Sequence, residues 1–391
     1  MTQSRKIMII AGESSGDTHA AKLVRAMREM DTDAAIQFFG AAGPKMRQEG
    51  VEAIVESDGL SIVGLAEIAA ALPIFLSAFR DLKAAAISQR PEVVILVDFP
   101  DFNLKLARAL KRKGFHVVYY ISPQLWAWRK YRISSVKKNI DLMLTILPFE
   151  KDWYAKHGIE NVEYVGSPLA REVHSDVGKE EFCRKHGLAP DRPIISLLPG
   201  SRQKEIVRIL PVMLEAAAKI SKQNSNVQFL VALASERNRS DVEKAVDGAV
   251  SDGLELSGVK KIEGETYDAL NASDAAAVTS GTATLEAGII GTPMAIVYKT
   301  SALNYKLFEP LIDVPHYGLI NLIAEKRVAK ELIQDEFTPK SLSDELLRLL
   351  EPNANSEMRS ELKIAADKLG HGGASKRAAE AIFNLLDRGS S

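Results

Sequence analysis

Short apolar runs alternate along the chain with segments in which apolar residues recur at helical spacing. The run "VVILV" within 91–102 is almost continuously apolar, which is typical of a central parallel strand buried on both faces. Repeated alternation of strand and helix favours a parallel sheet with helices on its faces. In the first part we predict strands at 6–11, 35–40, 91–102, 116–121 and 141–147, and helices at 18–30, at 102–114 and from residue 149 onward.

The same alternation begins again near residue 190, after a polar stretch. Strands are predicted at 194–198, 227–233 and 293–298, a long helix begins near Gln203, and 274–291 continues the pattern. We therefore predict an α/β protein with an N-terminal domain over 1–170 and a C-terminal domain over 190–350. Parallel sheets bind ligands at the carboxyl ends of their strands, so we expect the ligand in a cleft between the domains.

Size and composition agree with two domains and exclude some functions. A chain of 391 residues is too long for one ordinary core. Its net charge of -1 and pI of about 6.7 give no general attraction to nucleic acid, so we expect no nucleic-acid partner. A single cysteine, Cys183, excludes an internal disulfide, and the first residues lack the pattern of a signal peptide. We expect a cytoplasmic protein.

One apolar segment, 60–79, is long enough to span a membrane and contains a single charged residue, Glu67. That charge and Pro73 in the middle of the segment weigh against a spanning helix. Two interpretations stay open: a buried pair of helices, or a partly exposed apolar surface that contacts lipid. For the second interpretation the candidate lipid-facing residues are Leu65, Leu72, Phe75 and Leu76.

Basic residues gather in the same predicted domain. Interleaved with Trp126 and Trp128, they could meet a membrane surface that contains anionic lipids. The alternative is a solvated helix face. The basic residues are Lys105, Arg108, Lys111, Arg112, Lys113, Arg129, Lys130, Arg132, Lys137 and Lys138.

Asp98 is the first candidate for catalysis. It ends the apolar strand, where a parallel sheet places reactive groups, and a carboxylate there can act as a general base. The alternative is that it caps the next helix. Asp101 suits that cap better, because Asn103 starts the amphipathic pattern.

Two loops of the second domain are candidates for binding a diphosphate. In "LPGSR" (198–202), Gly200 lets the backbone N–H groups around Ser201 approach an anion, and Arg202 can form paired hydrogen bonds to phosphate. In "TSGTATLE" (279–286), small residues open a helix, and a carboxylate shortly after them suits two ribose hydroxyls. The residues concerned are Ser280, Gly281, Thr282 and Glu286. The alternatives are an ordinary turn and a tightly packed helix entry.

Six motifs, in order, resemble those of the lipid-A-disaccharide synthase family. They are "AGESSGD", "VDFPDFN", "ISPQLWAWRKYRI", "LPFEKDWY", "LPGSRQKEI" and "SGTATLEAG", and they begin at residue 11. The resemblance continues past Asn321 and so covers nearly the whole chain. The joint presence of "GESSGD", "DFPDFN" and "SPQLWAWR" is its most specific part.

The resemblance implies a GT-B glycosyltransferase with two Rossmann-like domains that face across a cleft. It implies transfer of 2,3-diacylglucosamine from its UDP derivative to 2,3-diacylglucosamine 1-phosphate, with inversion, which gives the β-1,6-linked disaccharide 1-phosphate and UDP. One general base is sufficient for such a displacement, and Asp98 would be that base. Neither a metal nor a further cofactor is implied. Because both substrates are lipids, we expect a peripheral protein at the inner leaflet of the inner membrane.

The resemblance also implies roles for other residues. The two loops of the second domain would hold the diphosphate, Glu286 would bind the ribose, and Asn321 would lie near the nucleotide. The first loop lacks the G-x-G-x-x-G pattern of a dinucleotide site and would form the acceptor-side wall near the sugar; its residues are Glu13, Ser14, Ser15, Gly16 and Asp17. The helical tail over 355–391 would pack back on an N-terminal domain, of its own chain or of a second copy in a homodimer.

Four positions depart from the family pattern: Ser167 replaces a usual histidine, His19 and Ala20 replace a small residue and a glycine, and Ile320 replaces a frequent proline. Two other functions remain as alternatives. A UDP-N-acetylglucosamine 2-epimerase would need carboxylates and histidines around a compact sugar and no apolar segment. A non-catalytic nucleotide-sugar sensor would use Arg202 and Glu286 but not Asp98.

Overall fold

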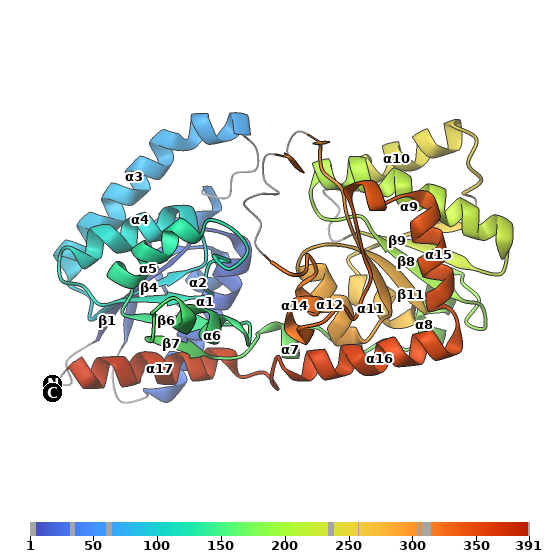
Figure 1. Ribbon diagram of the computed structural model, residues 1–391. Coiled ribbons are helices and arrows are strands. Elements are labelled where there is room, and N and C mark those ends of the chain that lie inside the picture. Colours follow the sequence, from blue (N-terminus) through green and yellow to red (C-terminus); the bar gives the residue numbers. More distant parts are fainter. Residues whose placement is uncertain are drawn as a thin grey trace. The chain divides into compact units, whose positions relative to one another are not determined.

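The chain divides into two compact units in the computed structural model (Figure 1). Unit 1 comprises Met1–Pro168 together with Gly372–Ser391, and unit 2 comprises Leu169–His371. The structure describes residues 5–31, 36–59, 65–233, 238–256, 258–302, 305–306 and 314–389, without the side chains of 59 and 65–71.

Unit 1 contains a seven-stranded parallel sheet of order β3-β2-β1-β4-β5-β6-β7. Alternate residues of β1 face opposite sides of the sheet: Ile7 and Ile9 belong to one core cluster, Met8 and Ile10 to the other. This period of two, buried on both faces, explains the continuous apolar run. The strands are β1 (Lys6–Ala11), β2 (Gln37–Ala42), β3 (Glu52–Glu56), β4 (Val93–Val97), β5 (Val117–Tyr120), β6 (Leu142–Thr145) and β7 (Val162–Tyr164).

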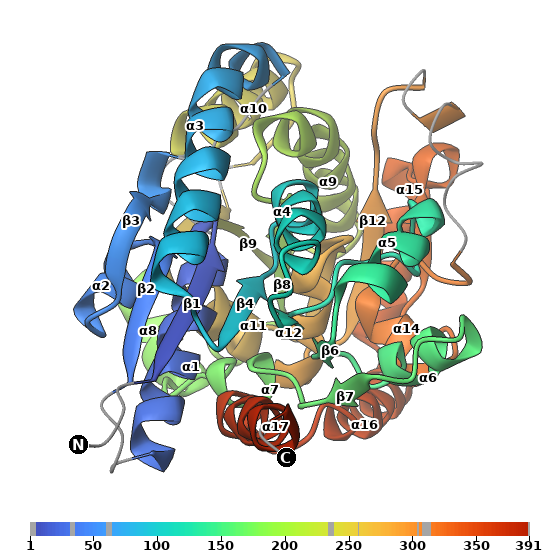
Figure 2. The same cartoon turned by 90° about the vertical axis from the view of Figure 1, so that its left-hand side faces the viewer.

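Helices cover both faces of this sheet. Residues of α1 and α17 share the core cluster of Ile7 and Ile9, and residues of α3 and α4 share that of Met8 and Ile10 (Figure 2). The helices of unit 1 are α1 (Ser14–Met30), α2 (Pro44–Gln48), α3 (Leu65–Gln89), α4 (Pro100–Lys111), α5 (Ile133–Asn139), α6 (Glu150–Lys156) and α17 (Ala374–Gly389).

Unit 2 repeats the plan with a six-stranded parallel sheet of order β10-β9-β8-β11-β12-β13. Its strands are β8 (Ile194–Leu198), β9 (Gln228–Leu233), β10 (Val259–Glu263), β11 (Ala275–Thr279), β12 (Met294–Tyr298) and β13 (Glu331–Ile333). Its helices are α7 (Leu169–Glu172), α8 (Lys179–His186), α9 (Gln203–Gln223), α10 (Arg239–Ser251), α11 (Thr266–Ala272), α12 (Thr282–Ile290), α14 (Leu319–Ala324), α15 (Pro339–Leu349) and α16 (Pro352–Asp367). The prediction of two parallel-sheet α/β domains is confirmed.

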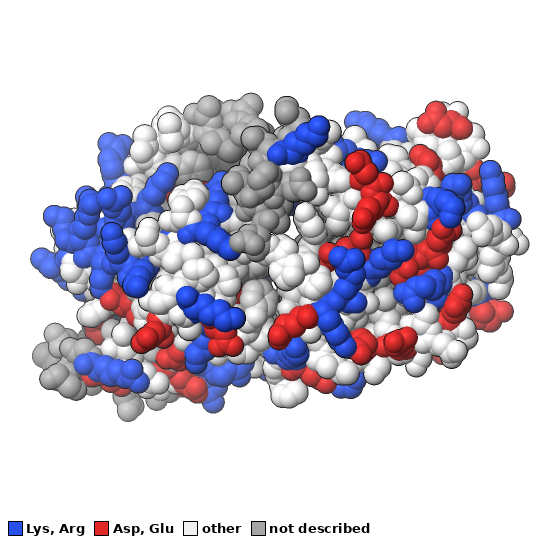
Figure 3. Space-filling view, in the orientation of Figure 1, with Lys and Arg blue, Asp and Glu red and all other residues white. Residues whose placement is uncertain are grey.

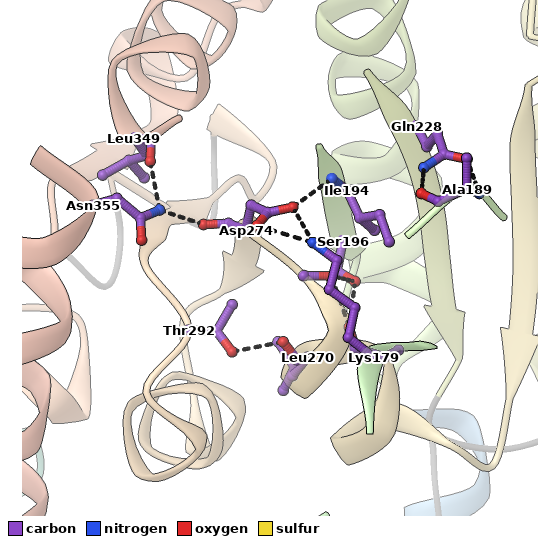
Figure 4. Close-up of polar contacts among 12 residues, drawn as sticks. Lys179, Ala189, Ile194, Ser196, Gln228, Leu270, Asp274, Thr292, Leu349 and Asn355 are labelled. Carbon is purple, nitrogen blue, oxygen red and sulfur yellow. Dashed lines mark hydrogen bonds and ion pairs between the residues drawn. The ribbon is translucent and has the colours of Figure 1, made fainter. Parts of the chain in front are cut away.

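Asp274 ties several elements together at the amino-terminal edge of the unit 2 sheet (Figure 4). Its carboxylate accepts hydrogen bonds from the backbone N–H of Ile194, at 2.8 Å, and from Nζ of Lys179, at 2.9 and 3.1 Å. Its carbonyl accepts one from Nδ2 of Asn355, at 2.7 Å. The start of β8 is therefore held to α8, to β11 and to α16 by one residue.

Four strands were not among the predicted ones, and all four lie at sheet edges. They are β3, β7, β10 and β13. An edge strand is not covered as completely as a central one, so it needs no continuous apolar run, and β10 reads "VKKIE" with two exposed lysines. Hydrophobic pattern alone therefore identifies central strands better than edge strands.

The described part of the apolar segment forms a single helix, not a pair of helices. From residue 65 it belongs to one helix, α3, which continues through Pro73 to Gln89. The interpretation as a buried pair of helices is thus wrong. Among the helices of the described residues, none is long and apolar enough to cross a membrane.

The tail is shared between the two units, whereas we predicted that all of 355–391 packs on an N-terminal domain. Helix α16 buries an apolar face, which includes Met358 and Leu362, against α12 and α14 of unit 2. Three glycines with positive φ, Gly370, Gly372 and Gly373, interrupt the helical run after it. Only α17 packs on α1 in unit 1, so the prediction is corrected for the residues before 372.

The Asp274 contacts predict a stability effect. Replacing Asp274 with Ala leaves the N–H of Ile194 and the ammonium of Lys179 without their acceptor, which should lower the free energy of unfolding by about 2 kcal/mol. Urea unfolding followed by circular dichroism measures the change. The control is Asp344→Ala, because Asp344 forms an exposed ion pair with Lys340, and the loss of that pair should cost less than about 0.5 kcal/mol. Equal midpoints for the two variants would contradict the role of Asp274.

Candidate active site

In each unit, two candidate loops lie side by side where the strand order reverses. In unit 1 the reversal lies between β1 and β4, and Ala11 pairs with Val97 at the strand ends. In unit 2 it lies between β8 and β11, where Leu198 pairs with Val278. Open α/β sheets bind ligands at the carboxyl ends of such strands. The structure thus brings the first loop next to Asp98, and "GSR" next to "SGT".

Asp98 sits on a sharp turn between β4 and α4. Its φ is 48° and that of Phe99 is 51°, so two successive residues with side chains adopt the left-handed conformation. Non-glycine residues adopt it rarely, and strain of this kind gathers at functional sites. The Asp98 side chain is half-buried at this turn.

The surroundings of Asp98 favour its protonated form. Burial is the largest effect and the negative charge of Glu13 adds to it, while a hydrogen bond from the backbone N–H of Phe99 acts in the opposite direction. The result raises the pKa of Asp98 to about 6. A carboxylate with that pKa is ionised at neutral pH and is a better proton acceptor than an ordinary aspartate.

The first loop has an exposed part and a buried part. Glu13, Ser14 and Ser15 are exposed at the start of α1, next to the end of β4. Gly16 is buried, and a Cβ placed on it would lie 3.7 Å from the Val97 carbonyl oxygen. The exposed residues are therefore the part of the loop that a substrate can reach.

Asp17, by contrast, is a structural residue. It is only 3% exposed, and its carboxylate accepts three backbone hydrogen bonds that cap the start of α2. The donors are the N–H groups of Gly43, Lys45 and Met46, at 3.0, 2.9 and 3.1 Å. Its predicted place on the acceptor-side wall is corrected, because donors 26 to 29 residues away already use both oxygens.

The first loop of unit 2 already holds an anion of its own. Gly200 has φ 103°, and the turn directs the N–H groups of Ser201 and Arg202 at the Glu205 carboxylate, at 3.2 and 3.3 Å. The Arg202 guanidinium donates to the same carboxylate at 2.8 Å, yet its side chain is 76% exposed. The predicted phosphate donors thus converge on one acidic group, which shows that the turn is suited to an anion. The sequence analysis missed Glu205.

The second loop of unit 2 leaves its helix start open. Gly281 has φ 148° with no atom within 4 Å of a Cβ placed on it, and Thr282 begins α12 in an exposed position. The Ser280 hydroxyl donates to the Tyr317 carbonyl at 2.6 Å, so it anchors the loop. Glu286 is half-buried one turn into the helix, and burial raises its pKa.

Asn321 is buried and its side chain is used within unit 2. Nδ2 donates to the Ala329 carbonyl at 2.7 Å and to Glu331 at 2.9 Å, and Oδ1 accepts from the Ala329 N–H at 2.9 Å. Glu331 in turn accepts from the N–H groups of Tyr317 and Gly318. The Asn321 side chain therefore supports the segment that anchors Ser280, and its place near the nucleotide stays a prediction.

The apolar surface is real but smaller than predicted. Leu72 and Leu76 are each 56% exposed, and Ile74, which we did not select, is 51% exposed. Phe75 is half-buried with its ring 6.1 Å from that of Phe99, so its assignment to the surface is corrected. The side chain of Leu65 lies outside the described residues.

The two tryptophans differ in the same way. Trp126 is only 5% exposed and its indole N–H donates to Glu150 at 3.0 Å, so it is a core residue and not the predicted membrane contact. Trp128 is 41% exposed, with the Arg129 guanidinium 3.9 Å from its ring centre. Apolar spacing cannot distinguish these residues, because they lie two positions apart in the same loop after β5 (Val117–Tyr120).

Glu150 is a second residue that the sequence analysis did not select. It is 1% exposed and accepts from Ser122 at 2.7 Å and from Trp126, as well as from the N–H groups of Ile146 and Leu147. Burial raises the pKa of Glu150 to about 7, against the effect of these four donors. The glutamate holds the loop after β5 to the loop after β6.

Basic side chains gather at the left of the face drawn in Figure 3. Four of the predicted basic residues of α4 and its C-terminal end are exposed: Lys105, Arg108, Arg112 and Lys113. Arg129 and Arg132 instead pair with Asp101 in the first turn of α4, so Asp101 is an ion-pair partner and not the expected cap. Across the described parts of the chain, no group of three or more His, Cys, Asp or Glu residues could hold a metal ion.

Two sheets of this order, each with ligand loops at its reversal point, define a protein of the GT-B class. Solved structures of that class are similar over nearly the full length. A UDP-GlcNAc 2-epimerase from Neisseria meningitidis bound to UDP-GlcNAc has a TM-score of 0.63 and 13% identity, with 97% of this chain and 100% of that chain covered. The sucrose-phosphate synthase of Thermosynechococcus elongatus has a TM-score of 0.61 and 14% identity, with 99% and 100% covered. At such identities the likeness shows the fold alone.

The chain belongs to the lipid-A-disaccharide synthase family. The profile described as Lipid-A-disaccharide synthetase matches residues 7–383. A lipid-A-disaccharide synthase of Myxococcus xanthus (strain DK1622) is 41% identical over 392 residues, the whole of both chains. One of Syntrophus aciditrophicus (strain SB) is 41% identical over 386 residues, 98% of this chain and 99% of the relative. The predicted family and enzyme class are confirmed: the protein is a glycosyltransferase, and only the fold is shared with the epimerases.

The charge of Glu13 predicts a measurable shift at Asp98. Replacing Glu13 with Gln removes a negative neighbour, so the ionised form of Asp98 costs less and its pKa should fall below about 6. Titration of the aspartate carboxyl carbons by ¹³C NMR measures this, with Asp98→Asn to assign the resonance. Glu52→Gln, an exposed substitution on β3, is the control and should leave the pKa unchanged. A pKa that rises or stays constant in Glu13→Gln would contradict the electrostatic argument.

Proposed function

We propose that the protein transfers 2,3-diacylglucosamine from UDP-2,3-diacylglucosamine to 2,3-diacylglucosamine 1-phosphate, forming the β-1,6-linked disaccharide 1-phosphate and UDP. Membership of the family supports the reaction. The observation that carries the mechanism is the carboxylate of Asp98, half-buried on a strained turn at the reversal point of unit 1. The exposed residues Glu13, Ser14 and Ser15 would form the acceptor side of the site.

The chemistry requires one proton acceptor. As the 6-hydroxyl oxygen of the acceptor attacks the anomeric carbon of the donor, its proton passes to the Asp98 carboxylate, and the bond from that carbon to the UDP oxygen breaks. Attack on the side opposite to UDP inverts the configuration. Asp98 then releases the proton to solvent, which a pKa of about 6 permits at neutral pH.

The leaving UDP needs positive charge and oriented N–H groups, and unit 2 supplies both. Arg202 and the N–H groups of Ser201 and Arg202 would bind the diphosphate once Glu205 gives up these donors. Gly281 and Thr282 at the open start of α12 would complete the diphosphate site, beside Gly200 and Ser280, which shape the two turns. Glu286 would accept the ribose hydroxyls. We expect neither a metal nor a further cofactor.

Substrates with long acyl chains favour an enzyme that works at a membrane surface. The exposed side chains of Leu72, Ile74 and Leu76 on α3, with Trp128 and the basic residues of α4, suit the inner leaflet of the inner membrane. Each acyl methylene that such a surface covers contributes about 0.8 kcal/mol. We therefore propose a peripheral protein on the cytoplasmic side. The homodimer stays a prediction.

Removing the carboxylate of Asp98 tests the reaction. Asp98→Asn keeps the size of the side chain but accepts no proton, so disaccharide formation should fall by about 10² to 10⁴-fold. Incubation of the protein with both lipid substrates, followed by chromatography of the products, measures it. Binding of UDP by calorimetry should be unchanged, and it should weaken in Arg202→Ala, which serves as the reverse control. Full activity of Asp98→Asn would reject Asp98 as the base, and absence of disaccharide with the unmodified protein would reject the function.

The exposed apolar residues of α3 predict the membrane contact. The double variant Leu72→Ser/Leu76→Ser should reduce binding to vesicles of phosphatidylethanolamine and phosphatidylglycerol by about tenfold, because two large apolar side chains no longer enter the lipid. Sedimentation of vesicles with the protein measures the bound fraction. Val250→Ser is the matched control, since Val250 is 52% exposed on α10 of unit 2. Equal binding by all variants would exclude the surface.

A further inference from the structure

The turn that carries Asp98 is held by hydrogen bonds from buried side chains that have no role in the proposed reaction steps. The backbone there is costly, because Asp98 and Phe99 have φ values of 48° and 51° in succession. Such a conformation persists only where surrounding groups fix it.

Two buried side chains donate to the same atom, the carbonyl oxygen of Asp98. Tyr119 donates from its hydroxyl at 2.6 Å, and Asn103 donates from Nδ2 at 2.7 Å. Nδ2 of Asn103 also lies 3.3 Å from the carbonyl oxygen of Val97, the last residue of β4. Both side chains are fully buried. The main chain on both sides of the Asp98 Cα is therefore attached to fixed groups.

Within the described part of the chain, the Asn103 side chain has no hydrogen-bond partner other than these two carbonyl groups. Its Oδ1 is buried and has no hydrogen-bond partner among the described residues. Leaving a buried acceptor unsatisfied is unfavourable, so a residue kept there must be required for what its donor does. The amide donor of Asn103 serves the two carbonyl groups at the turn.

A third contact sets the direction in which the chain leaves the turn. A Cβ on Gly12 would lie 2.2 Å from the ring of Phe99, so the ring occupies the space above this glycine. The first helical hydrogen bond of α4 then runs from the N–H of Asn103 to the Phe99 carbonyl, at 3.0 Å. The turn is thus fixed from the sheet, from the helix and from the first loop.

We propose that Tyr119 and Asn103 are positioning residues of the transfer reaction: they hold the Asp98 carbonyl and so aim the carboxylate of the base. This inference rests on the proposed role of Asp98. Neither residue contacts the substrate, because both side chains are fully buried. A general base acts only within hydrogen-bond reach of the proton it takes, so a small rotation of the turn lowers the rate of the chemical step.

The test combines the removal of each donor with the removal of the base. Tyr119→Phe removes only the hydroxyl, and Asn103→Ala removes the amide. Each should lower kcat by about tenfold or more, with the KM of both substrates within about twofold of the original values. In the Asp98→Asn background neither change should lower the residual rate further, because the groups act through the missing carboxylate. A merely structural role would lower the rate in both backgrounds.

Matched controls exist in the same unit. Tyr154→Phe removes another fully buried hydroxyl, which lies 3.4 Å from the Pro123 carbonyl. Asn161→Ala removes an amide that donates to the Ile140 and Asp141 carbonyls, at 2.8 and 2.7 Å. Neither control residue contacts the Asp98 turn in these bonds, so kcat should stay within about twofold. If Asn103→Ala fails to fold, Tyr119→Phe decides the outcome, since its shape is almost unchanged.

The proposal is overturned if Tyr119→Phe has the original kcat, or if it loses the same factor with and without the Asp98 carboxylate. These outcomes differ from a failure of the proposed function, in which the unmodified protein makes no disaccharide. In that case the ¹³C resonance of the Asp98 carboxyl carbon is the readout. A shift in Tyr119→Phe, absent in Tyr154→Phe, would support the positioning contact, and an unchanged resonance would reject it.

Discussion

The reversal of strand order in the middle of each sheet is the constraint on which the site depends. In unit 1 the chain leaves β1 into α1 on one face and leaves β4 into α4 on the other, as the two core clusters show. Because the connections diverge, the strand ends between them stay uncovered and polar groups there remain accessible. Asp98 and Glu13 meet at that place in unit 1. In unit 2 the equivalent place collects the turn of Gly200 and the open start of α12.

The extent of burial divides these acidic residues into two groups: those that hold the backbone and those whose pKa is raised. Asp17 and Glu331 are almost fully buried, and each accepts several backbone N–H groups, so their charges are satisfied and they fix the course of the chain. Asp98 and Glu286 are half-buried, and burial raises the pKa of both. Glu205 belongs to neither group. Its carboxylate accepts the N–H groups of the Gly200 turn, which a bound diphosphate would have to accept in its place.

Helix α3 has one side that is buried in unit 1 and one side that is exposed. Its inward side chains, Phe75 among them, pack against Phe99 and Phe102 near the turn that carries Asp98. Its outward side chains include three large apolar residues that this chain does not cover. A helix with this division links the lipid-facing surface of the proposal to the turn that carries Asp98, within one unit.

The sequence by itself determined the features that depend on composition along a single strand or loop. Central strands need apolar residues on both faces, so β1 and β8 were predicted with their observed ends, and Asp98 could be selected because it follows such a strand. The two unit 2 loops could also be selected as candidates, because their small and basic residues are contiguous in the sequence. Candidate residues at strand ends could therefore be selected from the sequence, and their roles in the reaction stay predictions.

Only the tertiary structure decided which polar groups meet across the sequence. Asp17 was assigned to the site because nothing in its neighbourhood shows that α2, 26 residues later, needs its carboxylate. Trp126 and Glu150 meet over 24 residues, and Tyr119 reaches the Asp98 carbonyl over 21. A hydrogen bond depends on distances of a few tenths of an ångström between groups that folding brings together, and no periodicity of apolar residues records those distances.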